Sequence, residues 1–342
     1  MAKILSFKEA LQSIEGVKHK HLLLGNGFSR ACRDDVFAYT ALYDQAKEGM
    51  PKRILSAFDI LKTTDFEWVM RALRQAAALV EAYAPKRAKL IAKLAEDADA
   101  LREILAETIA GNHPDRPGDI SVKQYKSCKK FLNHFESIYT LNYDLLLYWT
   151  LMQEELAPVI THDDGFRQPE DGPAGYVTWE VDKTDTQNVH YLHGALHIFD
   201  AGAEIQKFTW VNTGVALIDQ IREALKMNKF PLFVSEGSST EKLTRIQHSG
   251  LLNRSFRSFA KIQGALIIYG LSMSENDEHI LKLLERGKTS DILVGLYGDP
   301  TKQSNEAIIK RAKLISKRRN PRRPVNISFF DAASAHVWDA NV

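Results

Sequence analysis

The stretch HLLLGNGFS, residues 21–29, is the part of the chain that decides the fold. Its first four residues form a short, mostly apolar run, which is typical of a strand buried on both faces of a parallel sheet. Gly25 and Gly27 end this strand with a tight turn, and a helical pattern begins at Phe28 and Ser29. A strand, a glycine-containing turn and a helix in this order predict the first unit of an α/β fold.

Further apolar runs repeat the strand pattern along the chain. They occupy residues 137–141, 189–192, 231–234, 265–269, 292–297 and 325–330. Helical patterns alternate with the later runs, over residues 214–227, 240–261 with a break near Gly250, 275–287 and 304–318. Residues 155–188 are rich in Asp, Gly, Pro and Thr, which predicts a long loop or a small hairpin beside the sheet. The alternation predicts a Rossmann-like, doubly wound α/β fold with a mostly parallel sheet.

A long helical segment separates the first two strands. Residues 41–134 show no strand pattern, and apolar side chains recur at helical spacing over residues 65–83 and 86–110. We therefore expect one α/β domain, formed by residues 1–40 and 135–342, with a helical insertion at 41–134. Because the apolar helix faces exceed what one sheet face needs, we expect the insertion to cover the active-site mouth or to join subunits of a homo-oligomer.

The composition excludes several classes of protein. A chain of 342 residues with 26% charged residues and a net charge of +2 is globular and is not expected to bind nucleic acid over its whole surface. We interpret the basic run at residues 317–323 as a solvated helix end. Cys32 and Cys128 are too few for a four-cysteine zinc site and indicate a reducing cytoplasm. No apolar run approaches the roughly 20 residues of a membrane span, so we expect no membrane association.

Ligands of open α/β sheets bind beyond the carboxyl ends of the strands, so residues that follow the apolar runs are the candidate site. Gly25, Asn26, Gly27 and Ser29 follow the first run. Glycines allow the backbone to approach a phosphate, and the helix start offers free amide groups. An ordinary tight turn between strand and helix is the alternative interpretation of this loop.

The next two runs are also followed by polar residues. Asn142 is placed to orient a ribose hydroxyl or a water molecule, and Asp144 is expected to cap the following helix. His193, followed by Gly194, titrates near neutrality, which makes it the best general base of the set. A buried structural histidine is the alternative for His193. Its neighbours at 190 and 197 lie three and four residues away, and residues at an odd separation on a strand face opposite sides, so we expect no shared metal.

Two later loops complete the candidate site. Gly270, Ser272 and Asp277 follow the run at 265–269. Glu236 follows the run at 231–234, where it is placed either to contact a ribose or to lie in a helix N-cap.

Together these strand ends resemble the sirtuin-type NAD-binding domain. The family motifs occur in the same order, as Gly25, Gly27 and Ser29, then Asn142, Tyr143 and Asp144, then His193 and Gly194, then Gly270, Ser272 and Asp277. The resemblance covers about residues 18–40 and 135–300 and is nearest to the zinc-free bacterial branch, including antiphage NADase effectors and a related uncharacterised family. Asn26 replaces the usual alanine, the four-cysteine zinc module is missing, and Arg33–Phe37 is the nearest counterpart of the segment that shapes the nicotinamide pocket.

The resemblance implies that NAD⁺ is the substrate and that its nicotinamide–ribose bond is hydrolysed to give nicotinamide and ADP-ribose, without zinc. Asn142 and His193 are then the catalytic residues. The residues implied in NAD binding are Gly25, Asn26, Gly27, Ser29, Asp144, Gly194, Glu236, Gly270, Ser272 and Asp277, with Glu275 as an alternative to Asp277 at the adenosine ribose. It also suggests a role in antiphage defence with a protein partner or phage trigger.

Two alternatives remain open. A zinc-free protein deacylase or an ADP-ribosyltransferase shares the first bond cleavage but uses another acceptor. A non-catalytic module that senses NAD or ADP-ribose through the insertion binds the same ligand without turnover.

Overall fold

A parallel sheet forms the centre of the protein, for which a computed structural model describes residues 3–156, 161–170, 172, 174–209, 213–235 and 239–340. The sheet has seven strands in the order β1-β11-β10-β9-β2-β3-β6, and every neighbouring pair is parallel. The strands are β1 (Ile4–Leu5), β2 (Lys20–Leu24), β3 (Ser137–Thr140), β6 (Val189–Tyr191), β9 (Gln263–Tyr269), β10 (Lys288–Leu296) and β11 (Asn326–Asp331). The predicted Rossmann-like α/β fold is confirmed.

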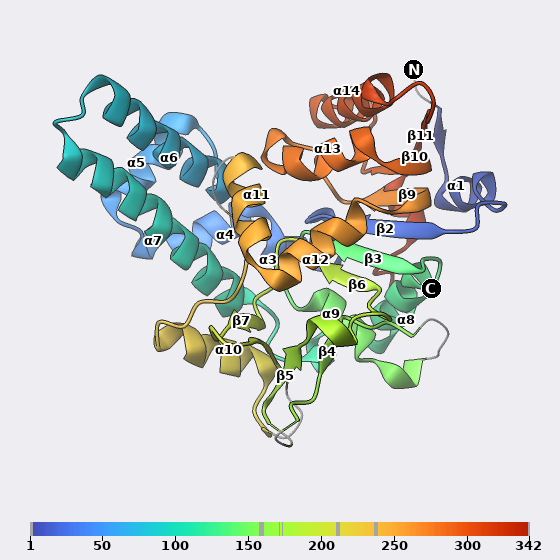
Figure 1. The fold of residues 1–342 in the computed structure, drawn as a ribbon, viewed down its shortest axis with the longest axis horizontal. Helices are drawn as coiled ribbons and strands as arrows, with labels where there is room; N and C mark the ends of the chain where they lie inside the picture. Colours follow the sequence, from blue (N-terminus) through green and yellow to red (C-terminus); the bar gives the residue numbers. More distant parts are fainter. Residues whose placement is uncertain are drawn as a thin grey trace.

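The strand order places a crevice at the carboxyl ends of the strands. Apart from the short edge strand β1, the strands follow the order 3-2-1-4-5-6 when they are numbered along the chain, which is the order of dinucleotide-binding sheets. The winding direction reverses between β2 and β9, and ligands of such sheets bind at this switch point. The carboxyl ends of the strands point toward the helical insertion, and their amino ends lie on the opposite side (Figure 1).

Helices cover both faces of the sheet because the strands bury side chains on both faces. In β2, Leu22 and Leu24 lie in one core and Leu23 in the other. The helices over the first face include α1 (Phe7–Ser13) and α8 (Val122–Leu132), and those over the second include α12 (Gly250–Phe259), α13 (Glu278–Arg286) and α14 (Gln303–Arg318). The break expected near Gly250 separates α11 (Ser239–His248) from α12.

The insertion is helical, as expected. It holds most of α4 (Tyr39–Ala46), then α5 (Lys52–Leu61), α6 (Phe66–Tyr83), α7 (Ala88–Asn112) and the sheet-covering α8, while α3 (Asp34–Phe37) lies just before it. The two long helices, α6 and α7, pack side by side and project away from the sheet (Figure 1). Phe66, Val69, Met70 and Leu73 are buried on one face of α6. No helix in the described part of the chain is long and apolar enough to cross a bilayer.

One expected strand after β6 needs correction. The run at 231–234 is not a strand, because its Leu232 and Val234 amides bond to carbonyls of Ile198 and His193 and it makes only one isolated bridge, between Phe233 and Gly194. The run at 231–234 is apolar because its side chains are largely buried.

The segment expected to be a long loop or a small hairpin does contain a short antiparallel pair of strands, and this pair belongs to a second sheet. This sheet is antiparallel, has four strands in the order β4-β5-β8-β7 and includes a pair of strands that the sequence did not predict. The strands are β4 (Phe166–Arg167), β5 (Tyr176–Trp179), β7 (Ile198–Asp200) and β8 (Ile205–Phe208).

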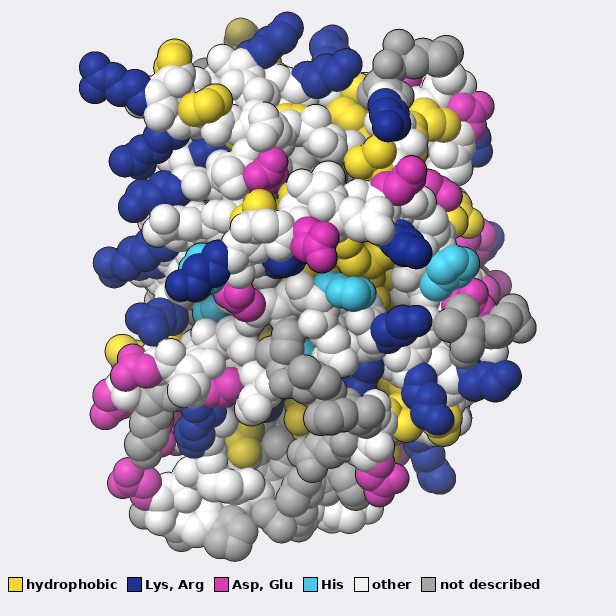
Figure 2. Space-filling model, turned by 90° about the vertical axis from the view of Figure 1, so that its right-hand side faces the viewer, with side chains coloured by type: hydrophobic (Ala, Val, Ile, Leu, Met, Phe, Trp, Pro, Cys, Tyr) yellow, Lys and Arg dark blue, Asp and Glu magenta, His cyan; other side chains and the backbone are white. Residues whose placement is uncertain are grey.

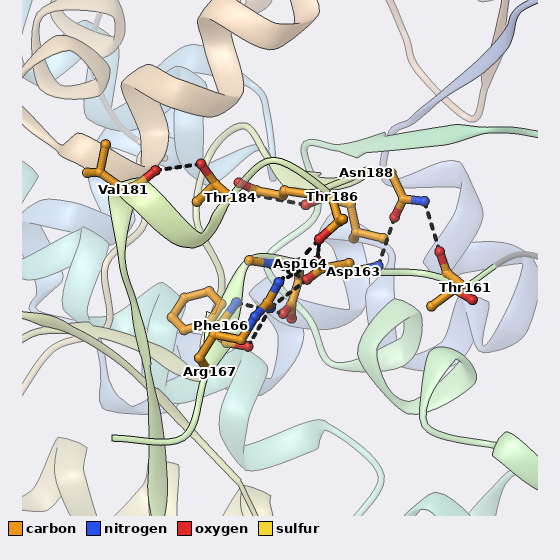
Figure 3. A network of polar contacts seen from close by, with 12 residues as sticks. Thr161, Asp163, Asp164, Phe166, Arg167, Val181, Thr184, Thr186 and Asn188 are labelled. Atoms are coloured by element: carbon orange, nitrogen blue, oxygen red, sulfur yellow. Dashed lines mark hydrogen bonds and ion pairs between the residues drawn. The ribbon is translucent and has the colours of Figure 1, made fainter. Parts of the chain in front are cut away.

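A polar network holds the chain around this second sheet (Figure 3). The Asp163 carboxylate accepts hydrogen bonds from Arg167 Nη2 at 2.6 Å and Thr186 Oγ1 at 2.5 Å, and the Asp163 amide donates to Asn188 Oδ1 at 2.8 Å. Burial alone would raise the pKa of Asp163, but the bonds from Arg167 and Thr186 lower it to about 2. The polar residues of this segment therefore fix its conformation.

Candidate functional site

A pocket of about 430 Å³ lies at the carboxyl ends of the strands, between the sheet and the insertion. We call it the carboxyl-end pocket. The loops after β2, β3 and β9 line one side, and helices of the insertion line the other. Of the expected site residues, it is lined by Gly25, Asn26, Gly27, Asn142, Asp144, His193, Gly270, Ser272 and Asp277.

The loops after β2 and β9 meet backbone to backbone at the switch point. The Gly27 amide donates to the Gly270 carbonyl at 2.8 Å, and a Cβ atom on Gly27 would lie 2.5 Å from Gly270 Cα. Gly270 also has a φ of +72°, which favours glycine. These glycines are required for the two loops to pack together, whether or not a phosphate approaches them.

A buried hydrogen-bonded chain orients Asn142. Its Nδ2 donates to Ser29 Oγ at 2.8 Å, and Ser29 in turn donates to Asp144 Oδ2 at 2.5 Å. Asp144 Oδ1 accepts from the Leu146 amide at 2.9 Å at the start of α9 (Leu146–Leu151), so Asp144 contacts the helix end as expected. Burial raises the pKa of Asp144, and the bonds from Ser29 and Leu146 oppose that rise. Ser29 is fully buried, so it supports Asn142 and does not line the pocket.

His193 reaches the pocket from the end of β6 and is paired with a second histidine. It is 1% exposed, its Nε2 lies 2.9 Å from His279 Nε2, and His279 Nδ1 lies 3.3 Å from Ser239 Oγ. Burial and the nearby Lys242 lower the pKa of both rings, to about 3 for His279. Both rings are therefore neutral near pH 7. When His193 Nε2 is the donor of the pair, its Nδ1 is left unprotonated and can act as a base.

Gly194 has a structural explanation. Its φ is +78°, and a Cβ atom there would lie 1.9 Å from the Leu232 carbonyl oxygen. The close approach of the loop at 231–234 therefore requires glycine at this position.

A buried charged cluster forms the side of the pocket next to His193. Lys242, on α11, is 0% exposed and donates to Glu67 Oε2 at 2.7 Å, while its Nζ lies 3.8 Å from Asp277 Oδ1. Glu67 Oε1 accepts from the hydroxyls of Tyr143 at 3.0 Å and Tyr39 at 3.4 Å. Glu67 lies in the first turn of α6, so the insertion contributes a carboxylate directly to the pocket.

Burial sets the protonation of this cluster. Burial raises the pKa of Asp277 to about 6. The positive charge of Lys242 opposes this rise, and the negative charge of Glu67 adds to it. Burial and repulsion by Glu67 also raise the pKa of Asp65, the N-cap of α6, to about 6. Burial lowers the pKa of Lys242, but Glu67 and Asp277 outweigh it and the pKa is raised, so Lys242 stays protonated. One ammonium thus faces three carboxyl groups, which makes this side of the pocket electronegative.

The remaining expected residues have other surroundings. Asn26 Nδ2 donates to the Phe37 carbonyl at 3.1 Å and ties the loop after β2 to α3. Glu275 is 86% exposed at its side chain and pairs with Arg71 of α6 at 3.3 Å. Ser272 is an exposed residue at the rim of the pocket. Glu236 lies outside the described residues.

The sequence patterns did not identify five of the residues around the pocket. These are Tyr39, Asp65, Glu67, Lys242 and His279. Two of them, Asp65 and Glu67, come from the insertion, for which the resemblance gave no counterpart.

No group of three or more His, Cys, Asp or Glu side chains that could hold a metal occurs among the residues that the structure describes. Cys32 and Cys128 are both buried and unpaired with each other, and burial raises the pKa of the Cys32 thiol to about 12. His190 stacks on Tyr139 and His197 packs against Tyr148, so neither shares the position of His193.

Comparison with known proteins places the chain in a family. No relative is found among curated proteins. A family profile described as Domain of unknown function (DUF4917) matches residues 22–338, which include most of the sheet, the insertion and both sides of the pocket. The chain therefore belongs to the DUF4917 family.

Proposed function

We propose that the protein is an NAD⁺ hydrolase that releases nicotinamide and ADP-ribose. The observation that carries this proposal is the convergence of Asn142 and His193 in one pocket at the switch point of a sheet with dinucleotide-binding strand order. A Rossmann-like sheet alone supports many activities, so the argument rests on these side chains.

The pocket offers a different group to each part of the dinucleotide. In this proposal the pyrophosphate approaches the backbone at Gly25 and Gly27, and the adenosine ribose lies at the rim beside Ser272; all three residues line the pocket. We expected Asp277 to hold that ribose, but its proximity to Lys242 and Glu67 favours a position beside the nicotinamide ribose. The nicotinamide end of NAD⁺ carries a positive charge, which fits the electronegative side of the pocket.

The chemistry needs few groups because nicotinamide leaves as a neutral molecule from a cationic pyridinium. Breaking the bond from C1′ to the ring nitrogen leaves positive charge on the ribose, which the carboxylates of Glu67 and Asp277 stabilise. Asn142 Oδ1, which no described group hydrogen-bonds, orients a ribose hydroxyl or the attacking water. His193 Nδ1 takes the proton from that water as its oxygen bonds to C1′, and later returns it to solvent.

Product analysis separates this activity from its alternatives. Purified protein is incubated with NAD⁺, with and without an acyl-lysine peptide, and the products are resolved by chromatography. Nicotinamide and ADP-ribose formed in equal amounts without peptide support hydrolysis. Nicotinamide release that requires the peptide favours the deacylase, and ADP-ribose attached to protein favours the transferase.

The sensing module shares the binding step but has no turnover. Glu67 links the insertion to the pocket, so ligand binding there has a direct physical route to α6. Calorimetry with NAD⁺ and ADP-ribose tests binding by itself. Binding without turnover supports a sensor, whereas the absence of a response to either ligand up to about millimolar concentration contradicts both proposals.

Assembly and biological role are further parts of the proposal. Leu79, Tyr83 and Leu90, at the end of the α6–α7 hairpin that projects from the sheet, are 60%, 87% and 47% exposed. We propose that they contribute to a homo-oligomer in the cytoplasm, and light scattering that shows a monomer would contradict this. A role in antiphage defence follows from the resemblance alone and is tested by phage infection of cells with and without the protein.

A further inference from the structure

A second pocket, of about 700 Å³, lies at the amino ends of the strands, on the opposite side of the sheet from the carboxyl-end pocket. We call it the amino-end pocket. Residues at the amino ends of β2, β3 and β9 line it together with one side of α12 and the end of β5. Figure 2 looks at this side of the molecule and shows Lys and Arg side chains gathered along one margin, with His side chains among them. Its volume lies within the range of small-molecule sites.

Three cations line the pocket from α12 and the turn that follows it. Arg254, Arg257 and Lys261 are three and four residues apart, so they project from the same side of the helix. None of them forms an ion pair with a carboxylate in the described part of the chain, and the only hydrogen bond of Arg254 there is a 3.4 Å contact to the Thr184 carbonyl. Like charges at this spacing repel one another, and a bound anion would relieve that repulsion.

A buried histidine faces the same pocket with one nitrogen unsatisfied. His21 is 9% exposed, and its Nε2 donates to the Gln263 carbonyl at 3.0 Å. Burial lowers the pKa of His21, so the ring is neutral and its Nδ1 is an acceptor. No described group donates to Nδ1, and a buried acceptor without a donor is unfavourable. Because Nδ1 itself is buried, a ligand hydroxyl satisfies this acceptor only after the groups that cover it move aside, whereas a bare anion would not satisfy it at all.

The wall opposite α12 is held in place before any ligand binds. Trp179 and Val181 line the pocket, and the Val181 carbonyl accepts from Thr184 Oγ1 at 2.8 Å (Figure 3). The Asp163 network fixes the chain on either side of this wall. A site that is already formed loses little conformational entropy when a ligand binds.

We propose that the amino-end pocket binds a phosphorylated sugar, up to the size of a nucleotide. The phosphate lies against Arg254, Arg257 and Lys261, and a sugar hydroxyl donates to His21 Nδ1. This proposal is independent of NAD⁺ hydrolysis, because no residue of the carboxyl-end pocket takes part in it.

Calorimetry with ribose 5-phosphate, ribose and inorganic phosphate tests the proposal. We expect ribose 5-phosphate to bind more tightly than either of the other two. The variant Arg254→Gln/Arg257→Gln removes two exposed cations and should weaken binding of ribose 5-phosphate by about tenfold or more. The matched control is Lys123→Gln/Lys126→Gln on α8, which removes two exposed cations at the same spacing and should leave the affinity unchanged.

His21→Leu tests the hydroxyl contact separately. This substitution should lower the affinity for ribose 5-phosphate but leave the affinity for inorganic phosphate unchanged. The proposal is overturned if ribose 5-phosphate does not bind at about 10 mM, if both double variants bind it equally, or if inorganic phosphate binds as tightly. Tight binding of a single-stranded oligonucleotide that the arginine variant abolishes would overturn it as well, in favour of a nucleic-acid surface.

Discussion

The two sides of the carboxyl-end pocket are held together in different ways. On the sheet side, the loops after β2 and β9 meet through backbone atoms at Gly27 and Gly270. On the insertion side, Glu67 of α6 meets Lys242 of α11 and Asp277, farther along the loop after β9, in a buried charged cluster. The first side depends on the absence of side chains, and the second depends on their charge. Substitutions should therefore affect folding most on the sheet side and chemistry most on the insertion side and at Asn142 and His193.

The largest effect is expected at Gly270. Gly270→Val places a β-branched residue at a φ of +72°, with its Cβ 2.6 Å from the Phe28 amide nitrogen. Backbone strain and overpacking together should lower the free energy of unfolding by about 5 kcal/mol, measured by chemical denaturation. Gly49→Ala is the control, because no atom lies within 4 Å of its Cβ position, and it should change stability little. Equal stability of the two variants would contradict the backbone contact.

A smaller loss is expected at Lys242. Lys242→Met leaves Glu67 and Asp277 buried without their cation and should lower the free energy of unfolding by about 3 kcal/mol. Adding Glu67→Gln removes one of the unpaired charges and should restore part of this stability, which a double-mutant cycle measures. Additive effects of the two substitutions would show that the cluster does not act as a unit.

The catalytic residues should affect rate more than stability or affinity. Asn142→Ala or His193→Ala should lower nicotinamide release by about a hundredfold while the Kd for NAD⁺ changes by less than about tenfold. His248→Ala, at an exposed position of α11, is the control and should retain the wild-type rate. A folded His193→Ala variant with the wild-type rate would make His193 structural.

The smallest effect concerns the junction of the insertion with the sheet side. His113 accepts from the Leu145 amide at 3.1 Å and donates to the Pro114 carbonyl at 3.0 Å, and burial lowers its pKa to about 4. Unfolded His113 binds a proton near pH 6.5 and the folded ring does not, so its contribution to stability is present above pH 6.5 and is lost toward pH 4.

This contribution is measured as a difference between two proteins. The stability advantage of wild type over His113→Gln should shrink by about 2 kcal/mol between pH 7 and pH 5. Asp65 and Asp277 have pKa values raised to about 6, so their contribution to stability increases as the pH falls, opposite to that of His113. Both proteins share this contribution, so it cancels in the difference. An advantage that does not change with pH would mean that His113 binds a proton as readily in the folded protein as in the unfolded chain.

The sequence patterns predicted the sheet side far better than the insertion side. The run at 21–24 and the polar residues after the strands follow local rules, and the structure brings the glycine turn, Asn142 and His193 to one pocket. Lys242 lies on an amphipathic helix, where local spacing predicts a solvated cation. It is buried because its partner Glu67 lies 175 residues away in the chain, and no local pattern encodes such a pairing.

The central claim is that this pocket hydrolyses NAD⁺, and a time course of nicotinamide release tests it most directly. The protein is incubated with NAD⁺ alone, beside the Asn142→Ala variant under identical conditions. We predict that wild type releases nicotinamide and ADP-ribose in equal amounts and that the variant releases both at least about a hundredfold more slowly. Equal rates of release for the two proteins, or NAD⁺ that stays intact with wild type, would contradict the account.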